Sequence, residues 1–162
     1  MHNSDNSLVK QLAKLLEEKG LTLSTAESCT GGGIGSWLTS LPGSSAWYLG
    51  GYICYSDAAK IRDLSVKPES IKEYGAVSEE VAAEMAIGAA KNMKSDLAIS
   101  VTGIAGPAGG TEEKPVGTVC FGWQVKDKIH TEINLFSGDR ADVQRQSIQR
   151  ALIVITELLN KL

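Results

Sequence analysis

Apolar residues recur along the chain with two periods, one close to the turn of an α-helix and one that alternates as in a β-strand. Near the start, Leu8, Leu12 and Leu16 fall on one helical face. Gly20 follows them as a stop signal. Helical spacing predicts helices over residues 7–19, 32–40, 56–64, 68–74, 78–93 and 139–162. Alternation predicts strands over residues 21–26, 47–55, 96–101, 117–125 and 129–136.

The order of these elements predicts the architecture. Helices and strands alternate through most of the chain, which favours a sheet covered by helices on both faces. The last two strands form a hairpin around residues 126–128, so the sheet is expected to be mixed. Gly50 and Gly51 are expected to weaken or bulge the second strand. With 162 residues and no linker or repeat, we expect one three-layer α/β/α domain, with residues 1–6 as a frayed terminus.

Composition narrows the class of protein. A formal net charge of −3 gives no electrostatic case for a nucleic-acid partner. No segment approaches the ~18 consecutive apolar residues of a membrane span, and the first residues lack the apolar stretch of a signal peptide. Cys29, Cys54 and Cys120 are odd in number and lack metal-type pairing, which indicates reduced thiols in a cytoplasmic protein. His2 and His130 are too few for a histidine-rich metal site, so no metal or cofactor is expected.

Two glycine-rich turns follow predicted strands. The first, residues 24–33, carries hydroxyls, one thiol and the carboxylate of Glu27 ahead of three glycines, and a helix starts directly after it. Glycines allow a ligand to approach closely, and the first N–H groups of a helix favour negative charge. The second turn covers residues 102–110. Neither matches a Walker or dinucleotide-binding fingerprint, but their positions after strands suggest one shared cleft. Glu27 either braces the first turn or pairs with a nearby cation.

Two residues of the first turn are candidate nucleophiles. Ser28 stands at the end of a strand and before the N-terminus of a helix, where backbone N–H groups can also stabilise an oxyanion. A buried capping serine would have the same sequence context. Cys29 would need a base, for which His130 in the hairpin is the candidate, and a small buried apolar side chain is the simpler interpretation of this thiol.

Lys60 is the candidate base for Ser28. It lies in the first turns of the helix that Ser56 and Asp57 open, so its ammonium meets the positive end of the helix dipole. Burial would also disfavour its charge, and both effects favour the neutral amine. Tyr55, at the end of the preceding strand, could relay the proton or hold the amine. The alternative is a solvated surface lysine, because spacing alone does not bring Lys60 to Ser28.

Six short blocks occur in the order found in one known family. They are TAESCTGG (25–32), GSSAW (43–47), YSDAAK (55–60), GAVS (75–78), TGIAGP (102–107) and KPVGTV (114–119). Together they resemble the CinA C-terminal domain family, over the chain from about residue 8 to the end. The resemblance is to the stand-alone form, without the molybdopterin-binding-like domain of full-length CinA proteins. It implies an amidohydrolase of the nicotinamide-nucleotide (NMN deamidase, PncC) type, which converts nicotinamide mononucleotide (NMN) to nicotinate mononucleotide and ammonia in pyridine-nucleotide salvage.

Matched by motif position, the resemblance implies that Ser28 is the nucleophile, Lys60 the general base and Tyr55 the residue that assists them. Asp57 stands where relatives often have asparagine, a polar exchange that should not touch the chemistry. Hydrolysis would proceed through an ester of Ser28, without a metal or cofactor. The expected partner is the small-molecule substrate, with no nucleic acid and no membrane.

Further contacts to the substrate are expected from both turns and from the last helix. Donors for the 5′-phosphate would come from a glycine-rich turn or from Arg140, which begins that helix and is equally compatible with a surface role. The second turn is expected near the reacting amide. The candidate substrate-binding residues are Thr30, Gly31, Gly32, Thr102, Gly103 and Arg140.

A function from another class is also compatible with the sequence, namely a catalytically silent nucleotide-binding or regulatory module linked to competence or stress responses. A pure binder needs no paired nucleophile and base, so the intact set of serine, tyrosine and lysine favours the enzyme. A homodimer is expected on the premise that Trp37, Trp47 or Tyr48 is exposed.

Overall fold

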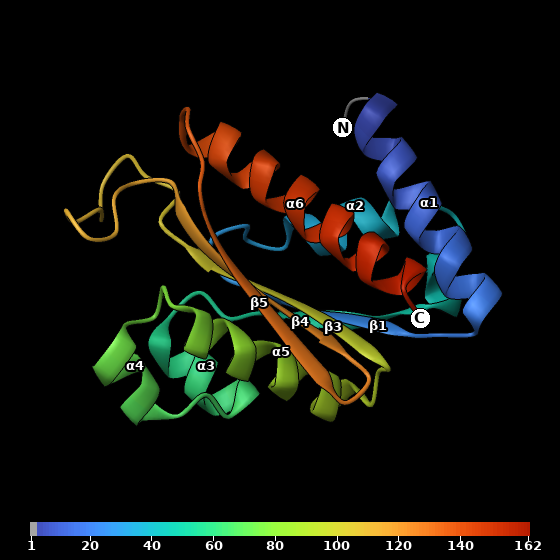
Figure 1. The fold of residues 1–162 in the computed structure, drawn as a ribbon, viewed down its shortest axis with the longest axis horizontal. Coiled ribbons are helices and arrows are strands. Elements are labelled where there is room, and N and C mark those ends of the chain that lie inside the picture. The colour runs from blue at the N-terminus through green and yellow to red at the C-terminus, as the bar shows by residue number, and fades with distance from the viewer. Residues whose placement is uncertain (1–2) are drawn as a thin grey trace.

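The computed structural model describes residues 3–162, which form helices on both faces of a five-stranded sheet (Figure 1). The helices are α1 (Asn3–Lys19), α2 (Gly33–Thr39), α3 (Asp57–Leu64), α4 (Pro68–Tyr74), α5 (Glu79–Met93) and α6 (Arg140–Asn160). The strands are β1 (Leu23–Glu27), β2 (Tyr48–Ile53), β3 (Leu97–Gly103), β4 (Thr118–Val125) and β5 (Lys128–Leu135). The sequence pattern does not predict the short 3-10 helix η1 (Ser44–Ala46).

The sheet is mixed, with the strand order β2-β1-β3-β4-β5. β1 pairs in parallel with β2 and β3, whereas β4 runs antiparallel to both β3 and β5. The pairing of β1 with β2 shifts by one residue next to Gly50, as the glycine pair predicts. Helices α1, α2 and α6 cover one face and α3, α4 and α5 the other (Figure 1). The predicted three-layer architecture is therefore confirmed.

Local signals place the starts of three helices correctly. Ser56 caps α3, Ser78 caps α5, and Asp139 opens α6 in a reciprocal capping box with Asp142. Strand ends differ more from the predicted ones. β3 continues to Gly103, two residues beyond its predicted end, because its last residues pair with β4. Cap residues act locally, whereas a strand end depends on its neighbour.

The N-terminal prediction is corrected by the start of α1. Residues 3–6 are helical and not frayed, and Asp5 is fully buried. Its carboxylate forms an ion pair with Arg145 of α6 at 3.4 Å and accepts a hydrogen bond from Gln149 Nε2 at 2.7 Å. These contacts tie the first turn of α1 to α6. Residues 1 and 2 of the predicted frayed segment lie outside the described residues. No helix within residues 3–162 combines the length and apolar character needed to cross a membrane.

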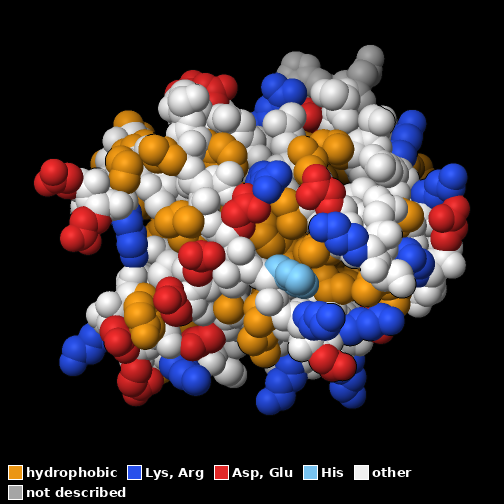
Figure 2. Space-filling view, in the orientation of Figure 1, with side chains coloured by type: hydrophobic (Ala, Val, Ile, Leu, Met, Phe, Trp, Pro, Cys, Tyr) orange, Lys and Arg blue, Asp and Glu red, His pale blue; other side chains and the backbone are white. Residues whose placement is uncertain are grey.

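The premise for a homodimer is wrong, because the aromatic residues behind it belong to the core. Trp47 is only 1% exposed, and Trp37 and Tyr48 are half-buried against the same apolar cluster. Exposed apolar side chains lie instead on the edge strands, such as Ile53 of β2 and Leu135 of β5. Figure 2 shows apolar side chains interspersed with charged ones on the face where β5 runs. The homodimer itself stays a prediction.

Candidate active site

Ser28 directly follows β1, at the edge of the sheet where β1 and β3 both end. Its N–H donates to the carbonyl of Val101 at 2.9 Å, and its own carbonyl accepts from the N–H of Gly31 at 3.0 Å. The side chain is buried, at 7% exposure. The backbone is thus held on both sides of the hydroxyl, which fixes where the Ser28 Oγ atom lies.

Lys60 reaches Ser28 from α3. Its Nζ atom lies 3.1 Å from Ser28 Oγ and 3.0 Å from the carbonyl oxygen of Cys54, and the residue is only 2% exposed. Among residues 3–162, no carboxylate lies within ion-pair distance of this amine. Burial lowers the pKa of Lys60, and the negative charge of Asp57 opposes that effect in part. A neutral amine at this distance can accept the Ser28 proton.

Tyr55 and Arg140 meet at the rim of the site, which the sequence did not predict. The Tyr55 hydroxyl accepts a hydrogen bond from Arg140 Nη2 at 2.8 Å, and Arg140 Nη1 donates to the carbonyl of Gly106 at 2.9 Å. Tyr55 is 59% exposed, and its hydroxyl bonds to neither Lys60 nor Ser28. Within residues 3–162, the expected contact between the Tyr55 hydroxyl and the Lys60 amine is therefore not formed.

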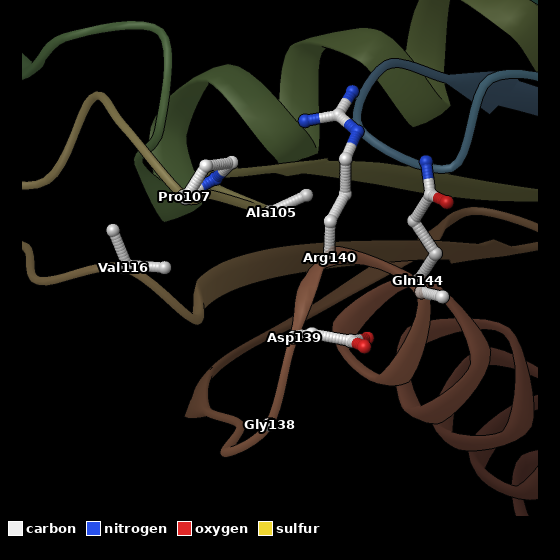
Figure 3. Close-up of a pocket in the computed structure, with 8 residues that line it drawn as sticks. Ala105, Pro107, Val116, Gly138, Asp139, Arg140 and Gln144 are labelled. Carbon is white, nitrogen blue, oxygen red and sulfur yellow. The ribbon is translucent and has the colours of Figure 1, made fainter.

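Two adjoining cavities meet at Arg140. One of about 250 Å³ is lined by Ser28, Cys29, Tyr55, Arg140 and residues 103–106, 108 and 109. The other, of about 630 Å³, shares Arg140 and Ala105 with it and continues along the start of α6. Figure 3 shows Arg140 and Gln144 extending in the same direction from this first part of α6. Both glycine-rich turns thus contribute to one cleft at the carboxyl ends of the strands, as predicted.

The first turn is pinned by Glu27, and its candidate substrate-binding residues are partly engaged. The Thr30 hydroxyl donates to the Glu27 carboxylate at 2.6 Å, and the Gly31 N–H is taken by the Ser28 carbonyl. Gly32 has φ 95°, and a Cβ there would lie 2.8 Å from a carbon of Ile53. Glycine is therefore favoured at position 32 by its backbone conformation, whereas the exposed Ile53 side chain could move aside for a Cβ.

On the second turn, the structure separates the two candidate residues. Gly103 lines the smaller cavity together with Ser28. Thr102 is buried at 1% exposure, and its hydroxyl donates to the carbonyl of Ala76 at 2.9 Å. Thr102 therefore holds the turn before α5 against β3, and its hydroxyl could donate to substrate only after this bond is broken.

The alternative pair of Cys29 and His130 is not brought together. Cys29 follows the carboxyl end of β1, whereas His130 pairs with Trp123 on the hairpin and lines a separate cavity beside Lys126 and Leu158. Burial raises the pKa of the Cys29 thiol to about 12. A thiol that stays protonated and lacks a base is a poor nucleophile.

Sequence reasoning missed two groups that shape this site. The Cys54 carbonyl, which anchors Lys60, is a backbone group and gives no signal in the sequence. Gln144 donates to the carbonyl of Cys29 at 2.9 Å. It lies four residues after Arg140, on the same side of α6, and this spacing could have identified it.

The family model of the CinA C-terminal domain matches residues 5–159 of this chain. Among relatives, a nicotinamide-nucleotide amidohydrolase PncC of Escherichia coli K12 is 47% identical over 90% of this chain and 88% of that protein. A CinA-like protein of Chloroherpeton thalassium is 46% identical over 97% of this chain, which spans 38% of that relative's length.

Solved structures agree with the fold. A competence or damage-inducible protein from Enterobacter asburiae has a TM-score of 0.94 at 38% identity, covering 98% of this chain and 99% of that one. The competence/damage inducible protein CihA from Agrobacterium tumefaciens has a TM-score of 0.94 at 34% identity, covering 99% and 98%. On the family match and these similarities, the chain belongs to the CinA C-terminal domain family.

Proposed function

We propose that this protein hydrolyses the carboxamide of NMN to nicotinate mononucleotide and ammonia, with Ser28 as nucleophile and Lys60 as general base. The observation that carries the proposal is the 3.1 Å contact between Lys60 Nζ and Ser28 Oγ; both residues are buried, and Ser28 lines the smaller cavity. The substrate class is supported by the name of the Escherichia coli relative, a nicotinamide-nucleotide amidohydrolase.

The steps follow from the two side chains. Neutral Lys60 takes the proton of Ser28 as Oγ attacks the amide carbon, and the amide oxygen becomes an oxyanion. When the C–N bond breaks, the ammonium of Lys60 returns its proton to the leaving nitrogen, so ammonia departs and an ester of Ser28 remains. Water, deprotonated by Lys60, then attacks the ester and releases the carboxylate. The nucleophile and the base are regenerated.

The two cavities divide the substrate between them in this proposal. The nicotinamide ring occupies the smaller cavity, which contains Ser28, and the ribose phosphate extends into the larger one past Arg140. Loss of one charge-assisted hydrogen bond should cost about 1.5–3 kcal/mol. We expect Arg140→Ala to impair hydrolysis of NMN much more than hydrolysis of nicotinamide riboside. Equal losses with both substrates would assign Arg140 to holding Tyr55 instead.

The test of the function is product analysis with the wild-type protein. It should release ammonia and nicotinate mononucleotide from NMN in equal amounts. Added hydroxylamine should divert part of the product to the hydroxamate, because hydroxylamine competes with water for an ester intermediate. A folded protein that binds NMN and releases no ammonia would contradict the proposed activity. Ammonia release without any hydroxamate would contradict the ester intermediate.

A further inference from the structure

We infer that Glu27 is a positioning residue for acyl transfer, since its buried carboxylate takes the place of the missing N-cap of α2 and holds the turn that carries Ser28. The inference rests on the proposed function, because Glu27 would act on the step that Ser28 performs. Glu27 is the last residue of β1 and is 1% exposed. A charge so deeply buried needs hydrogen-bond donors, and their identity indicates its role.

Among residues 3–162, the Glu27 carboxylate has three donors, and all of them come from the segment that follows Ser28. The Thr30 hydroxyl donates to Oε2 at 2.6 Å, the Ile34 N–H to Oε2 at 2.9 Å and the Gly35 N–H to Oε1 at 2.8 Å. The last two belong to the first turn of α2, whose N-cap residue, Gly32, has no side chain with which to accept them. Glu27 therefore caps a helix from five residues before the cap position.

This capping closes residues 27–34 into a loop. The chain leaves Glu27, passes Ser28 and returns to the same carboxylate at Thr30 and Ile34. Two backbone bonds, from Gly31 N–H to the Ser28 carbonyl and from Gly33 N–H to the Thr30 carbonyl, brace it internally. Few dihedral angles near the nucleophile are then free to change.

The loop leaves two backbone donors without an acceptor in any other described residue. Within residues 3–162, the N–H groups of Cys29 and Thr30 form no hydrogen bond to another residue. Cys29 comes directly after the nucleophile and lines the cavity that contains it. An N–H group in that place can stabilise the oxyanion of the proposed reaction, provided that the turn is held still. Glu27 supplies that constraint without touching the substrate.

Gly35 and Tyr48 limit the space around the Glu27 carboxylate. A Cβ at Gly35 would lie 2.8 Å from the Tyr48 hydroxyl and 3.6 Å from Glu27 Oε1. Tyr48 in turn shares a hydrogen bond of 2.8 Å with Thr25 Oγ1. Glycine at position 35 thus leaves room for the Tyr48 hydroxyl beside its N–H donor to Glu27. Gly35 and Tyr48 together therefore define the surroundings of the Glu27 carboxylate.

The test compares Glu27→Gln and Glu27→Ala with the wild type, using Leu159→Ala as a control for lost stability. Glutamine keeps one acceptor oxygen, so it should restore part of what alanine loses. We expect kcat for NMN to fall about tenfold with glutamine and about a hundredfold with alanine. KM should change by less than about threefold, because the residue makes no contact with substrate. Leu159 is fully buried near the end of α6, so its truncation should lower the melting temperature and leave kcat near the wild-type value.

A second readout does not depend on NMN. The initial release of p-nitrophenolate from p-nitrophenyl acetate reports acylation of Ser28. Only the part of this release that is lost in Ser28→Ala is counted as specific. The Glu27 variants should slow this acylation in the same order as they lower kcat. Equal acylation and equal kcat in Glu27→Gln, Glu27→Ala and the wild type would overturn the inference. A wild type that acylates on Ser28 but releases no ammonia from NMN would contradict the proposed function alone.

Discussion

Two buried ionisable side chains on opposite faces of the sheet have opposite surroundings. Asp5, in the first turn of α1, has a cationic partner in Arg145 and a donor in Gln149, both of α6. Within residues 3–162, the amine of Lys60, on the other face, donates hydrogen bonds only to the Ser28 hydroxyl and a backbone carbonyl, although the residue is almost as deeply buried. A buried charge without a countercharge costs free energy, so its presence needs a reason other than stability. Asp5 joins two helices, whereas the proposed role of Lys60 is to provide the amine that acts as the base.

The largest effect on turnover is expected from a substitution of Lys60. Lys60→Met keeps the length of the side chain but removes the amine, so turnover of NMN should fall by about 10³- to 10⁴-fold. The free energy of unfolding should stay the same or rise, because an ionisable amine that is buried without a countercharge is lost. Turnover and urea denaturation of the same preparation measure both quantities.

Lys67→Met, at an exposed lysine that caps α4 without a side-chain bond, serves as the matched control. It should change neither quantity appreciably. Turnover by Lys60→Met within a few fold of the wild type would remove the lysine from the mechanism.

The reverse result is expected at Asp5. Asp5→Ala should destabilise the fold by about 1–3 kcal/mol, because the Gln149 donor and the half-exposed Arg145 lose their acceptor. Turnover at 25 °C should remain at the wild-type level, since α1 contributes nothing to either cavity lining. Asp5→Asn, which keeps an acceptor oxygen, should lose less stability than Asp5→Ala. A drop in kcat with unchanged stability would contradict a purely structural role of Asp5.

The pH dependence sharpens the account of Lys60. Because burial lowers the pKa of Lys60, turnover should rise with pH through a midpoint below the ordinary lysine value of about 10.4. Asp57 raises the pKa of Lys60, so Asp57→Asn should move the midpoint to lower pH. A midpoint that moves upward in Asp57→Asn, measured as kcat/KM against pH, would show that another group is being titrated.

The lowered pKa of Lys60 also makes the free energy of unfolding depend on pH. Between the folded and unfolded pKa values of Lys60, the unfolded chain binds more protons, so the contribution of Lys60 to stability rises with pH across that interval. Lys60→Met should remove this rise, which denaturation at several alkaline pH values can detect. A rise of the same size in the variant would assign it to other groups.

The smallest effect is expected at Cys29. Its thiol is buried, its pKa is raised to about 12, and among residues 3–162 no base forms a hydrogen bond with it. Cys29→Ala should therefore keep kcat within about twofold, with a stability loss of about 1 kcal/mol for the small cavity. Loss of turnover as large as that of Ser28→Ala would make the thiol the nucleophile.

Local signals in the sequence were sufficient for much of the fold. Ser56, Ser78 and Asp139 mark helix starts because a cap acts within one turn of chain. Exposure was less predictable, since Trp47 is covered only when distant segments pack together.

The site depended on contacts between distant residues. Ser28 and Lys60 are 32 residues apart, and Tyr55 and Arg140 are 85 apart. No periodicity reports such pairs, and only the family resemblance pointed to the first of them. The partner of the Thr102 hydroxyl, a backbone carbonyl, was equally hidden.

Ammonia release from NMN by the wild type, Ser28→Ala, Lys60→Met and Cys29→Ala, each shown to be folded, tests the central claim most directly. The account predicts turnover by the wild type and Cys29→Ala, and almost none by Ser28→Ala or Lys60→Met. Turnover that survives the loss of Ser28 or Lys60, or that depends on Cys29, would contradict it.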